Sequence, residues 1–309
     1  MKISIVTVCF NASTTITATL ASVAEQTYPD VEHVIIDGQS NDTTLDIVRR
    51  FPHVADTLSE PDSGLYDAMN KGLSRISGDY VLFLNADDKF PSPSTIAEVV
   101  AEITANAGAD VYYGALEVRP LAGDAFIFRP PPPCAAPEFM ILGCLPHQST
   151  LARPSVFEKT GRFDLQYRFH AEYDWFLKIL ADDTIDVRQL NATIGSFQEG
   201  GASSQLHKGQ PEVFVIQERS ALYRGTEWDK IRITALHHAL LRERIEVVRL
   251  RDVLNGQSCK LALAAAATRT ASSRLGRPNW RKILRPFVPG LALRLLRQWR
   301  AHAVESRRS

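Results

Sequence analysis

The stretch GDYVLFLNADD, residues 78–88, decides the fold, because an apolar strand runs directly into a cluster of oxygen-bearing side chains. The run Tyr80–Asn85 predicts a buried strand, and Asp87 and Asp88 follow at its carboxyl end. In an open parallel sheet, ligands bind beyond the carboxyl ends of the strands. Amide and carboxylate oxygens suit a hard divalent cation and the phosphates that it carries. The stretch therefore predicts a cation- and phosphate-binding site at one edge of a sheet.

Strand-like and helical patterns alternate along the first hundred residues. Strands are predicted at Ile3–Phe10, Val31–Asp37, Val54–Ser59 and Tyr80–Asn85. Helices are predicted between them, at about 14–26, 43–51 and 65–76. The strands are continuous Val/Ile/Leu runs, which is typical of a sheet covered on both faces. Strands that alternate with helices of this length indicate an α/β fold with a mainly parallel sheet.

The pattern changes further along the chain. A strand is predicted at 110–118, a stiff proline-rich loop at 129–133, helices at 154–160 and 172–180, and a strand at 185–198. Beyond residue 212 the chain is predicted to be helical and increasingly basic. We therefore expect an α/β domain over residues 1–210 and a helical, basic C-terminal extension over 211–309.

Composition excludes several classes of protein. The chain is 45% hydrophobic and 23% charged, as is ordinary for a globular protein. Its four cysteines, at positions 9, 134, 144 and 259, form no CxxC pair, which argues against a zinc site or a disulfide framework and suits a reducing cytosol. The first residues show no signal-peptide pattern, and no apolar run approaches the roughly 18–20 residues that cross a bilayer. We expect a cytoplasmic protein.

The net charge of zero conceals an asymmetry. Residues 270–309 carry ten basic side chains and one acidic one (10 − 1 = +9), so the preceding 269 residues carry −9, from 25 basic and 34 acidic side chains. A basic tail on an acidic body is informative about partners rather than about the fold.

Two more strand ends carry polar groups that suit a nucleotide. Asn11 follows the first strand, and Asp37 and Ser40 follow the second. Any one of these segments alone reads as a loop rich in turn-forming residues. Three of them at one sheet edge are far less expected by chance, and together they indicate a nucleotide site.

The ordered set of motifs resembles a family of enzymes. The matching segments are SIVTVCFN (4–11), SVAEQTY (22–28), EHVIIDGQSNDT (32–43), GLYDAMNKG (64–72) and GDYVLFLNADD (78–88). The chain resembles a family 2 glycosyltransferase of the GT-A fold, of the type that builds bacterial surface polysaccharides. The resemblance covers roughly the first 200 residues. It implies a Rossmann-like, mainly parallel sheet flanked by helices.

The resemblance also implies a donor site. A nucleoside-diphosphate sugar, linked to UDP or GDP, would be bound by Thr7, Asn11, Asp37, Ser40, Lys71, Asn85 and Asp87. In the family an Asp-x-Asp motif binds Mn²⁺ or Mg²⁺, which holds the donor diphosphate. Here Asn85 stands in place of the first carboxylate, so Asp87 becomes the principal metal ligand, with Asp88 as a helper.

A general base is implied at the start of a later helix. The resemblance aligns Glu172 with the family's base, with Asp174 as the alternative, and direct displacement would invert the anomeric centre. From the residues alone, both are ordinary acidic residues at a helix amino terminus. His147 and Gln148 would line the acceptor side, although a lone histidine is as often structural.

The tail predicts a membrane partner. Leu291, Leu295 and Trp299 share one helical face, and arginines occupy other angles, as in a helix that lies on an anionic membrane surface. Packing against the body and nonspecific attraction to nucleic acid are the alternatives, and we expect no nucleic-acid partner. The predicted enzyme extends a lipid-linked glycan at the inner face of the plasma membrane. Two other functions remain open: a sugar nucleotidyltransferase, and a catalytically inactive sugar-nucleotide-binding assembly subunit.

Overall fold

The structure is a computed structural model that describes residues 1–200 and 206–269. The chain divides into two compact units, residues 1–240 and 241–309. The first unit extends past residue 210 because helix α8 (Leu206–Arg219) packs the buried Ile216 and Gln217 against it. A functional division between a catalytic domain and an extension stays a prediction.

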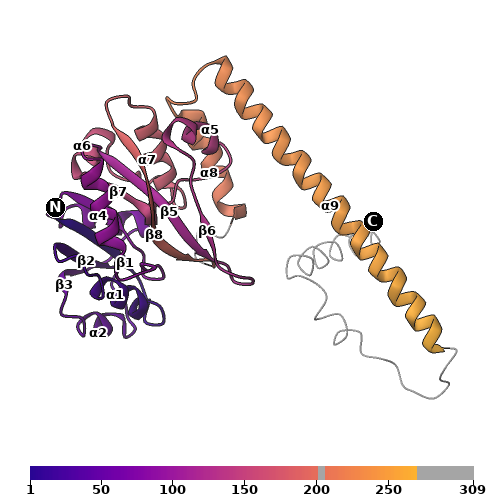
Figure 1. Cartoon of the computed structure of the whole chain (residues 1–309), viewed down its shortest axis with the longest axis horizontal. Helices are drawn as coiled ribbons and strands as arrows, with labels where there is room; N and C mark the ends of the chain where they lie inside the picture. The colour runs from indigo at the N-terminus through magenta and orange to yellow at the C-terminus, as the bar shows by residue number, and fades with distance from the viewer. Residues whose placement is uncertain (201–205, 270–309) are drawn as a thin grey trace. The chain divides into compact units, whose positions relative to one another are not determined.

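Within the described residues, eight strands form one sheet (Figure 1). The strands are β1 (Ile3–Cys9), β2 (Val31–Asp37), β3 (Val54–Ser59), β4 (Tyr80–Phe83), β5 (Val111–Arg119), β6 (Phe126–Phe128), β7 (Thr150–Ala152) and β8 (Val187–Gln198). Their order is β3-β2-β1-β4-β7-β5-β6, and β8 pairs with β5. Strands β1 to β4 are mutually parallel, as predicted, and β5 is parallel to β8. The short β6 and β7 are antiparallel to their neighbours and were not predicted.

Strands β1, β2 and β3 end at the same level. Cys9 of β1 pairs with Asp37 of β2, which pairs with Ser59 of β3. On the other side of β1, Val6 pairs with Phe83 at the end of β4. The polar segments that follow these strands are therefore brought to one edge of the sheet.

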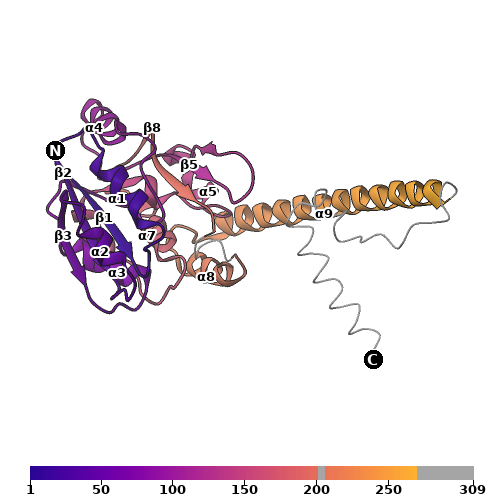
Figure 2. The same cartoon turned by 90° about the horizontal axis from the view of Figure 1, so that it is seen from below.

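Helices cover both faces of the sheet, as Figures 1 and 2 show. The helices of the first two hundred residues are α1 (Ile16–Ala24), α2 (Thr44–Val48), α3 (Leu65–Leu73), α4 (Thr95–Ala105), α5 (Ala136–Phe139), α6 (Pro154–Thr160) and α7 (Ala171–Leu180). Side chains of α3, α6, α7 and α8 pack with Val6 and Val8 on one face. On the other face, α4 packs with Ile3 and Ile5 in one cluster, and α1 and α2 pack in another. The alternation along β1 thus places apolar side chains on both faces, which is why its sequence is continuously apolar.

Helix α7 rests on an aromatic cluster. The ring of Trp175 stacks on Phe157 with centroids 4.6 Å apart and meets Phe163 edge-on at 5.7 Å. Phe163 also contacts Phe83 at the end of β4. These contacts fix the first turns of α7 relative to the carboxyl edge of the sheet.

The rest of the described chain is helical. Helix α9 (Thr226–Arg269) lies in the part of the chain beyond residue 212 that was predicted to be helical. No helix within residues 1–200 and 206–269 is both long and apolar enough to span a membrane. The predicted amphipathic helix with Leu291, Leu295 and Trp299 lies outside the described residues.

Candidate functional site

The buried side chain of Asp37, at the end of β2, contacts residues at the ends of β1 and β3. Its side chain is fully buried, and its carboxylate accepts from the Ser40 amide at 2.9 Å, the Ser40 hydroxyl at 2.5 Å and the Ser59 hydroxyl at 2.7 Å. The Cys9 thiol lies 3.5 Å from the same carboxylate. Asp37 therefore shapes the edge of the sheet through internal bonds, and its predicted contact with a nucleoside stays a prediction.

Asn11 and Ser40 are held against each other beside Asp37. The Asn11 amide donates to the Ser40 hydroxyl at 2.8 Å, and the Asn41 amide donates to Asn11 Oδ1 at 2.9 Å. Asn11 and Gln39 both adopt left-handed backbone conformations, with φ of 50° and 64°. Such strain persists where the surroundings fix it and is often found at ligand sites.

An exposed aromatic ring lies over this edge. Phe10 is 62% exposed, although it directly follows a buried strand. Gly38 lies between Phe10 and Asp62, and a Cβ at Gly38 would lie 2.4 Å from an Asp62 carboxylate oxygen and 3.4 Å from the Phe10 ring. The backbone at Gly38 is thus closely flanked by an aromatic face and a carboxylate. Phe10 was not among the predicted site residues, and its signal in the sequence is an aromatic residue placed beyond the last buried strand position.

Two predicted donor residues have other partners. Thr7 is fully buried and bonds to His33 Nε2 at 2.9 Å, which in turn contacts His53. Burial lowers the pKa of His33 to about 3. The Lys71 ammonium bonds to the Pro61 carbonyl at 2.6 Å and to Glu60 at 3.0 Å.

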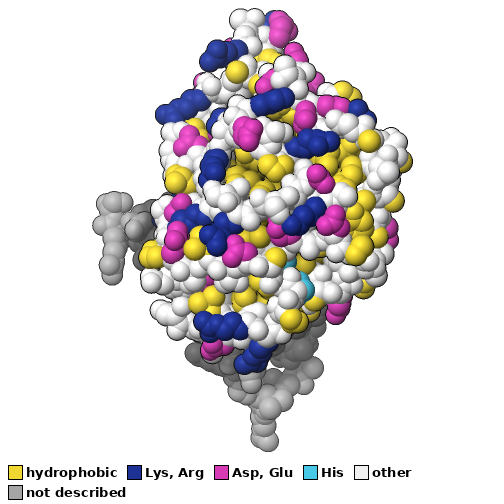
Figure 3. Space-filling view, turned by 90° about the vertical axis from the view of Figure 1, so that its left-hand side faces the viewer, with side chains coloured by type: hydrophobic (Ala, Val, Ile, Leu, Met, Phe, Trp, Pro, Cys, Tyr) yellow, Lys and Arg dark blue, Asp and Glu magenta, His cyan; other side chains and the backbone are white. Residues whose placement is uncertain are grey.

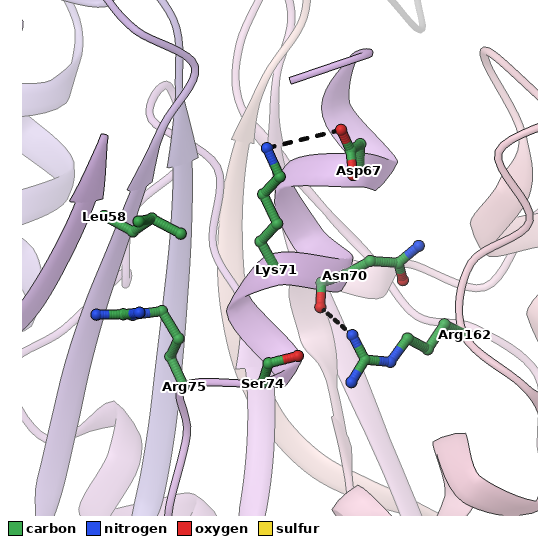
Figure 4. Close-up of a pocket in the computed structure, with 7 residues that line it drawn as sticks. All are labelled: Leu58, Asp67, Asn70, Lys71, Ser74, Arg75 and Arg162. Atoms are coloured by element: carbon green, nitrogen blue, oxygen red, sulfur yellow. Dashed lines mark hydrogen bonds and ion pairs between the residues drawn. The ribbon is translucent and has the colours of Figure 1, made fainter. Parts of the chain in front are cut away.

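Lys71 also lines a shallow pocket of about 270 Å³ along α3. Figure 4 shows its side chain directed toward Asp67 and away from Arg75. Its bonds to residues 60 and 61 tie down the segment that leads to Asp62. Lys71 thus affects the candidate site indirectly, by holding the segment that carries Asp62. Its direct contact with a donor phosphate stays a prediction.

The segment after β4 contains buried oxygens without hydrogen-bond partners. Neither Asn85 Oδ1 nor the two oxygens of Asp88 has a hydrogen bond within the described part of the chain. Burial raises the pKa of Asp87, and the Arg119 guanidinium opposes this rise. Burial and the neighbouring Asp87 raise the pKa of Asp88 well above its usual range, although Gln148 approaches closely enough to oppose it. Water-excluded acidic groups beside one arginine create an environment in which an additional cation is strongly favoured.

The oxygens at the β4 end fit a divalent cation that is shared with a substrate. Among residues 1–200 and 206–269, no group of three or more His, Cys, Asp or Glu side chains could hold an ion by itself. Mg²⁺-type ions in phosphate sites use one or two carboxylates and take further ligands from the phosphates and water. The half-buried Asp87 and the unbonded Asn85 Oδ1 match that requirement. Asp88 is only 1% exposed, so it would support Asp87 and Asn85 through its charge rather than bind the ion directly.

His147 lies against the same segment. Its Nε2 is 3.3 Å from Asn85 Nδ2, and burial lowers the pKa of the ring to about 4. A neutral ring can accept the amide proton and so leave Asn85 Oδ1 available. Gln148 is buried next to it, at 7% exposure. The structure therefore brings the predicted acceptor-side pair next to the predicted donor-side asparagine.

Glu172 occupies a buried position at the start of α7. It is 8% exposed, and burial raises the pKa of its carboxyl to about 7, against a bond from the Tyr66 hydroxyl that lowers it. Tyr66 stands at the start of α3, directly after the β3 edge, so Glu172 reaches the same side of the sheet. His170 Nδ1 lies 3.9 Å from the other Glu172 oxygen. Such a carboxyl can take up a proton near neutral pH.

Asp174, the alternative base, has a different environment. Its carboxylate forms an ion pair with Lys178 at 2.7 Å, one turn along the helix. This is the i, i+4 pairing expected of oppositely charged residues on one helix face. The geometry favours Glu172 over Asp174 as a proton acceptor.

Comparisons with known proteins agree on one family. The family model "Glycosyl transferase family 2" matches residues 4–130. A PGL/p-HBAD biosynthesis glycosyltransferase of Mycobacterium tuberculosis is 31% identical over 211 residues, which is 66% of this chain and 79% of that protein.

Solved structures of low sequence identity share the fold. Staphylococcus aureus TarS 1–349 in complex with UDP-GlcNAc superposes with a TM-score of 0.59 at 18% identity, over 75% of this chain and 70% of that one. The mannosyltransferase PcManGT from Pyrobaculum calidifontis, in complex with GDP-Man and Mn²⁺, gives 0.56 at 18% identity, over 98% and 80%. The predicted α/β fold of the GT-A type is confirmed.

Proposed function

This chain belongs to glycosyltransferase family 2, and from that premise we propose that it moves a sugar from a nucleoside-diphosphate donor to a hydroxyl of a glycan, with inversion. The family is one of glycosyltransferases, which transfer a sugar rather than a nucleotidyl group, so the nucleotidyltransferase alternative is set aside. The proposal is supported by the unbonded oxygens after β4 together with the buried carboxyl of Glu172, which we infer to face the same edge of the sheet because Tyr66, its partner, stands at the start of α3 after β3.

The nucleoside end of the donor would lie on the β1–β2 side of this edge. The exposed Phe10 ring offers a face for a base, and Asp62 offers a carboxylate to a base imide or a ribose hydroxyl. Asn11 and Ser40 would fix the backbone that frames this position, through the bond between them and the bond from the Asn41 amide to Asn11.

The diphosphate would lie at the end of β4. Asp87 and Asn85 would hold a Mn²⁺ or Mg²⁺ ion jointly with the donor phosphates, and the ion would supply Lewis-acid stabilisation of the departing diphosphate. Arg119 would add positive charge beside Asp87. His147 would keep Asn85 oriented, through the contact between its ring nitrogen and the amide.

Glu172 would act as the general base. The acceptor oxygen attacks the anomeric carbon while its proton passes to the Glu172 carboxylate, and the bond from that carbon to the diphosphate oxygen breaks. The leaving nucleoside diphosphate keeps the electron pair. One such displacement inverts the anomeric centre. A carboxyl with a pKa of about 7 is suited to this step, because ideal general bases titrate near the working pH.

Tyr66 can accommodate both protonation states of the base. Its hydroxyl contacts the Glu172 carboxylate and lies 2.9 Å from the Phe169 carbonyl. When Glu172 is ionised, Tyr66 donates to it. When Glu172 has taken the proton, it can donate to the Tyr66 oxygen while Tyr66 donates to Phe169. Glu172 therefore keeps a hydrogen-bond partner in Tyr66 in both protonation states.

The acceptor would be a lipid-linked glycan at the inner face of the plasma membrane. The support is the relative named for PGL/p-HBAD biosynthesis and the charge of +9 over residues 270–309. A basic tail is attracted to anionic lipids and would hold the enzyme near such an acceptor.

The test is a screen of the purified full-length chain with UDP-GlcNAc, UDP-glucose and GDP-mannose. Release of nucleoside diphosphate is measured with Mn²⁺, with Mg²⁺ and after EDTA treatment. We expect turnover of at least one donor that depends on the cation. Absence of turnover from every donor, with and without a lipid-phosphate acceptor, would instead support a subunit that binds sugar nucleotides without catalysis.

A further inference from the structure

The segment that precedes Glu172 is held by a single side chain from α8. The Glu212 carboxylate accepts from the backbone amides of Arg168 at 2.8 Å, Phe169 at 2.8 Å and His170 at 3.1 Å. These are the three residues directly before α7. One carboxylate thus satisfies three consecutive N–H groups that would otherwise have no helix or strand partner.

The same bonds fix the groups that contact the proposed base. The Phe169 carbonyl and the His170 amide belong to one peptide plane. The amide is bound by Glu212, and the carbonyl accepts from Tyr66, which also bonds to Glu172. A continuous set of hydrogen bonds therefore runs from Glu212 through the peptide to Tyr66 and Glu172.

Helix α8 is itself firmly placed against α7 and the residues before it. Gln217 donates to the Ile141 carbonyl at 3.0 Å and to the Tyr173 hydroxyl at 2.7 Å, and Ile216 is fully buried. At Gly209 the two segments touch so closely that a Cβ would lie 2.2 Å from His170 Nε2. The backbone that carries Glu212 therefore has little freedom to move away.

We propose that Glu212 is a positioning residue for catalysis, which orients the Glu172 base by holding the 168–170 backbone and the Tyr66 contact. The inference rests on the proposed function of Glu172. Catalysis by a base requires alignment within hydrogen-bond reach, and small misplacements of a reacting group can cost roughly 100-fold in rate.

Glu212 also acts on Glu172 through its charge. The titratable groups that face Glu172 are Tyr66 from α3, Cys144 from the loop after α5, His170 from its own segment, and Glu212 from α8. Of these, Tyr66 and Cys144 have pKa values well above their usual range, and burial lowers the pKa of His170. Burial is the larger cause of the raised pKa of Glu172, and the negative charge of Glu212 adds to it.

The first arm of the test measures the backbone and needs no substrate. Hydrogen exchange of the peptide that spans 168–170 is compared in the full-length wild type, Glu212→Gln, Glu212→Ala and Glu158→Gln. Glu158 is an exposed glutamate on α6, so its change removes the same charge elsewhere. In Glu212→Gln the side-chain NH₂ group, which cannot accept a hydrogen bond, replaces one of the carboxylate oxygens that bind the three backbone N–H groups. We expect exchange at these amides to rise roughly tenfold or more in both Glu212 variants and to stay unchanged in the control.

The second arm measures pH profiles with whichever of UDP-GlcNAc, UDP-glucose or GDP-mannose the wild type turns over. Glu212→Gln should lower kcat roughly 10- to 100-fold with a smaller change in donor KM. Removal of the neighbouring negative charge should move the acidic limb of the profile to lower pH, a shift that a merely structural role would not produce.

The two proposals fail in different ways. A wild type that turns over no donor defeats the proposed function. The positioning role is overturned if the wild type is active and the Glu212→Gln variant keeps the wild-type value of any one of three quantities. These are kcat, the position of the acidic limb of the pH profile, and the hydrogen-exchange rate of the amides at 168–170. The proposed function is left standing by that result. If Glu212→Ala does not fold, the isosteric Glu212→Gln variant decides the question.

Discussion

Burial of Glu172 gives the carboxyl a pKa near neutrality at the expense of fold stability. Below pH 4.5 the group is protonated in both the folded and the unfolded chain. As pH rises toward 7, the unfolded chain loses its proton first, because the pKa of the folded state is about 7. The unfolded state binds fewer protons in this window, so the free energy of unfolding falls as pH rises.

The Glu172→Gln substitution separates these two effects. At pH 8 the variant should lose roughly 100-fold or more in kcat, because the base is absent. Its free energy of unfolding should rise by up to about 3 kcal/mol, and the gain should shrink toward pH 5. Urea unfolding at both pH values and donor turnover check these outcomes, with Glu158→Gln as the control. A variant that is active and no more stable would remove Glu172 from the proposed role.

Residues of the site differ in how far the sequence could predict them. Asn85 and Asp87 stand in a strand-end pattern that the residues themselves show, whereas Glu172 was predicted only through the resemblance to the family. The contact of Tyr66 with Glu172 joins residues 106 apart in the chain, and no periodicity encodes it. Thr7 was predicted to bind the donor, but the alternation along β1 places its side chain inside the fold, where it bonds to His33.

At the scale of elements, the edge formed by β1, β2 and β3 depends on one buried carboxylate. Asp37 accepts from Ser40 and Ser59 and lies against Cys9, and it pairs in register with both neighbouring strands. The long parallel strands were predicted because continuous apolar runs bounded by turn residues identify them. The short β6 and β7 were missed, because three residues carry no period and their pairing depends on β5 and β4.

The Asp37→Asn substitution tests the role of this carboxylate. The amide group would turn a donor toward the hydroxyl and amide groups that now donate to Asp37. We expect a loss of about 2–3 kcal/mol in the free energy of unfolding, together with weaker donor binding. Urea unfolding measures the first effect, and titration with UDP and GDP measures the second. Wild-type stability would show that Asp37 does not join these strands.

At the scale of the molecule, one face of the described chain carries charges of both signs. Lysine and arginine side chains are interspersed with aspartate and glutamate over the face shown in Figure 3. The excess of positive charge predicted to bind a membrane belongs to residues 270–309, outside the described part. The proposed membrane binding therefore rests on the sequence of these residues alone.

Substitution of Arg294, Arg297 and Arg300 by glutamine tests the membrane proposal on the full-length chain. Each arginine near an anionic surface contributes about 1 kcal/mol, so sedimentation with phosphatidylglycerol vesicles should fall by roughly 100-fold in affinity. Turnover of a soluble donor should not change. Equal sedimentation of variant and wild type would refute the proposal.

The hydrogen bonds of Glu212 also matter for how the protein is made. Ribosomes release the amino-terminal strands first, and domains fold as their segments emerge. The strand ends that would bind the donor are complete by residue 88, yet the residue that holds the segment before the base is synthesised more than a hundred residues later. If the proposed roles hold, a nascent or prematurely terminated chain that ends before α8 should bind nucleotide sugar without transferring it, and catalysis would begin only after α8 has been synthesised.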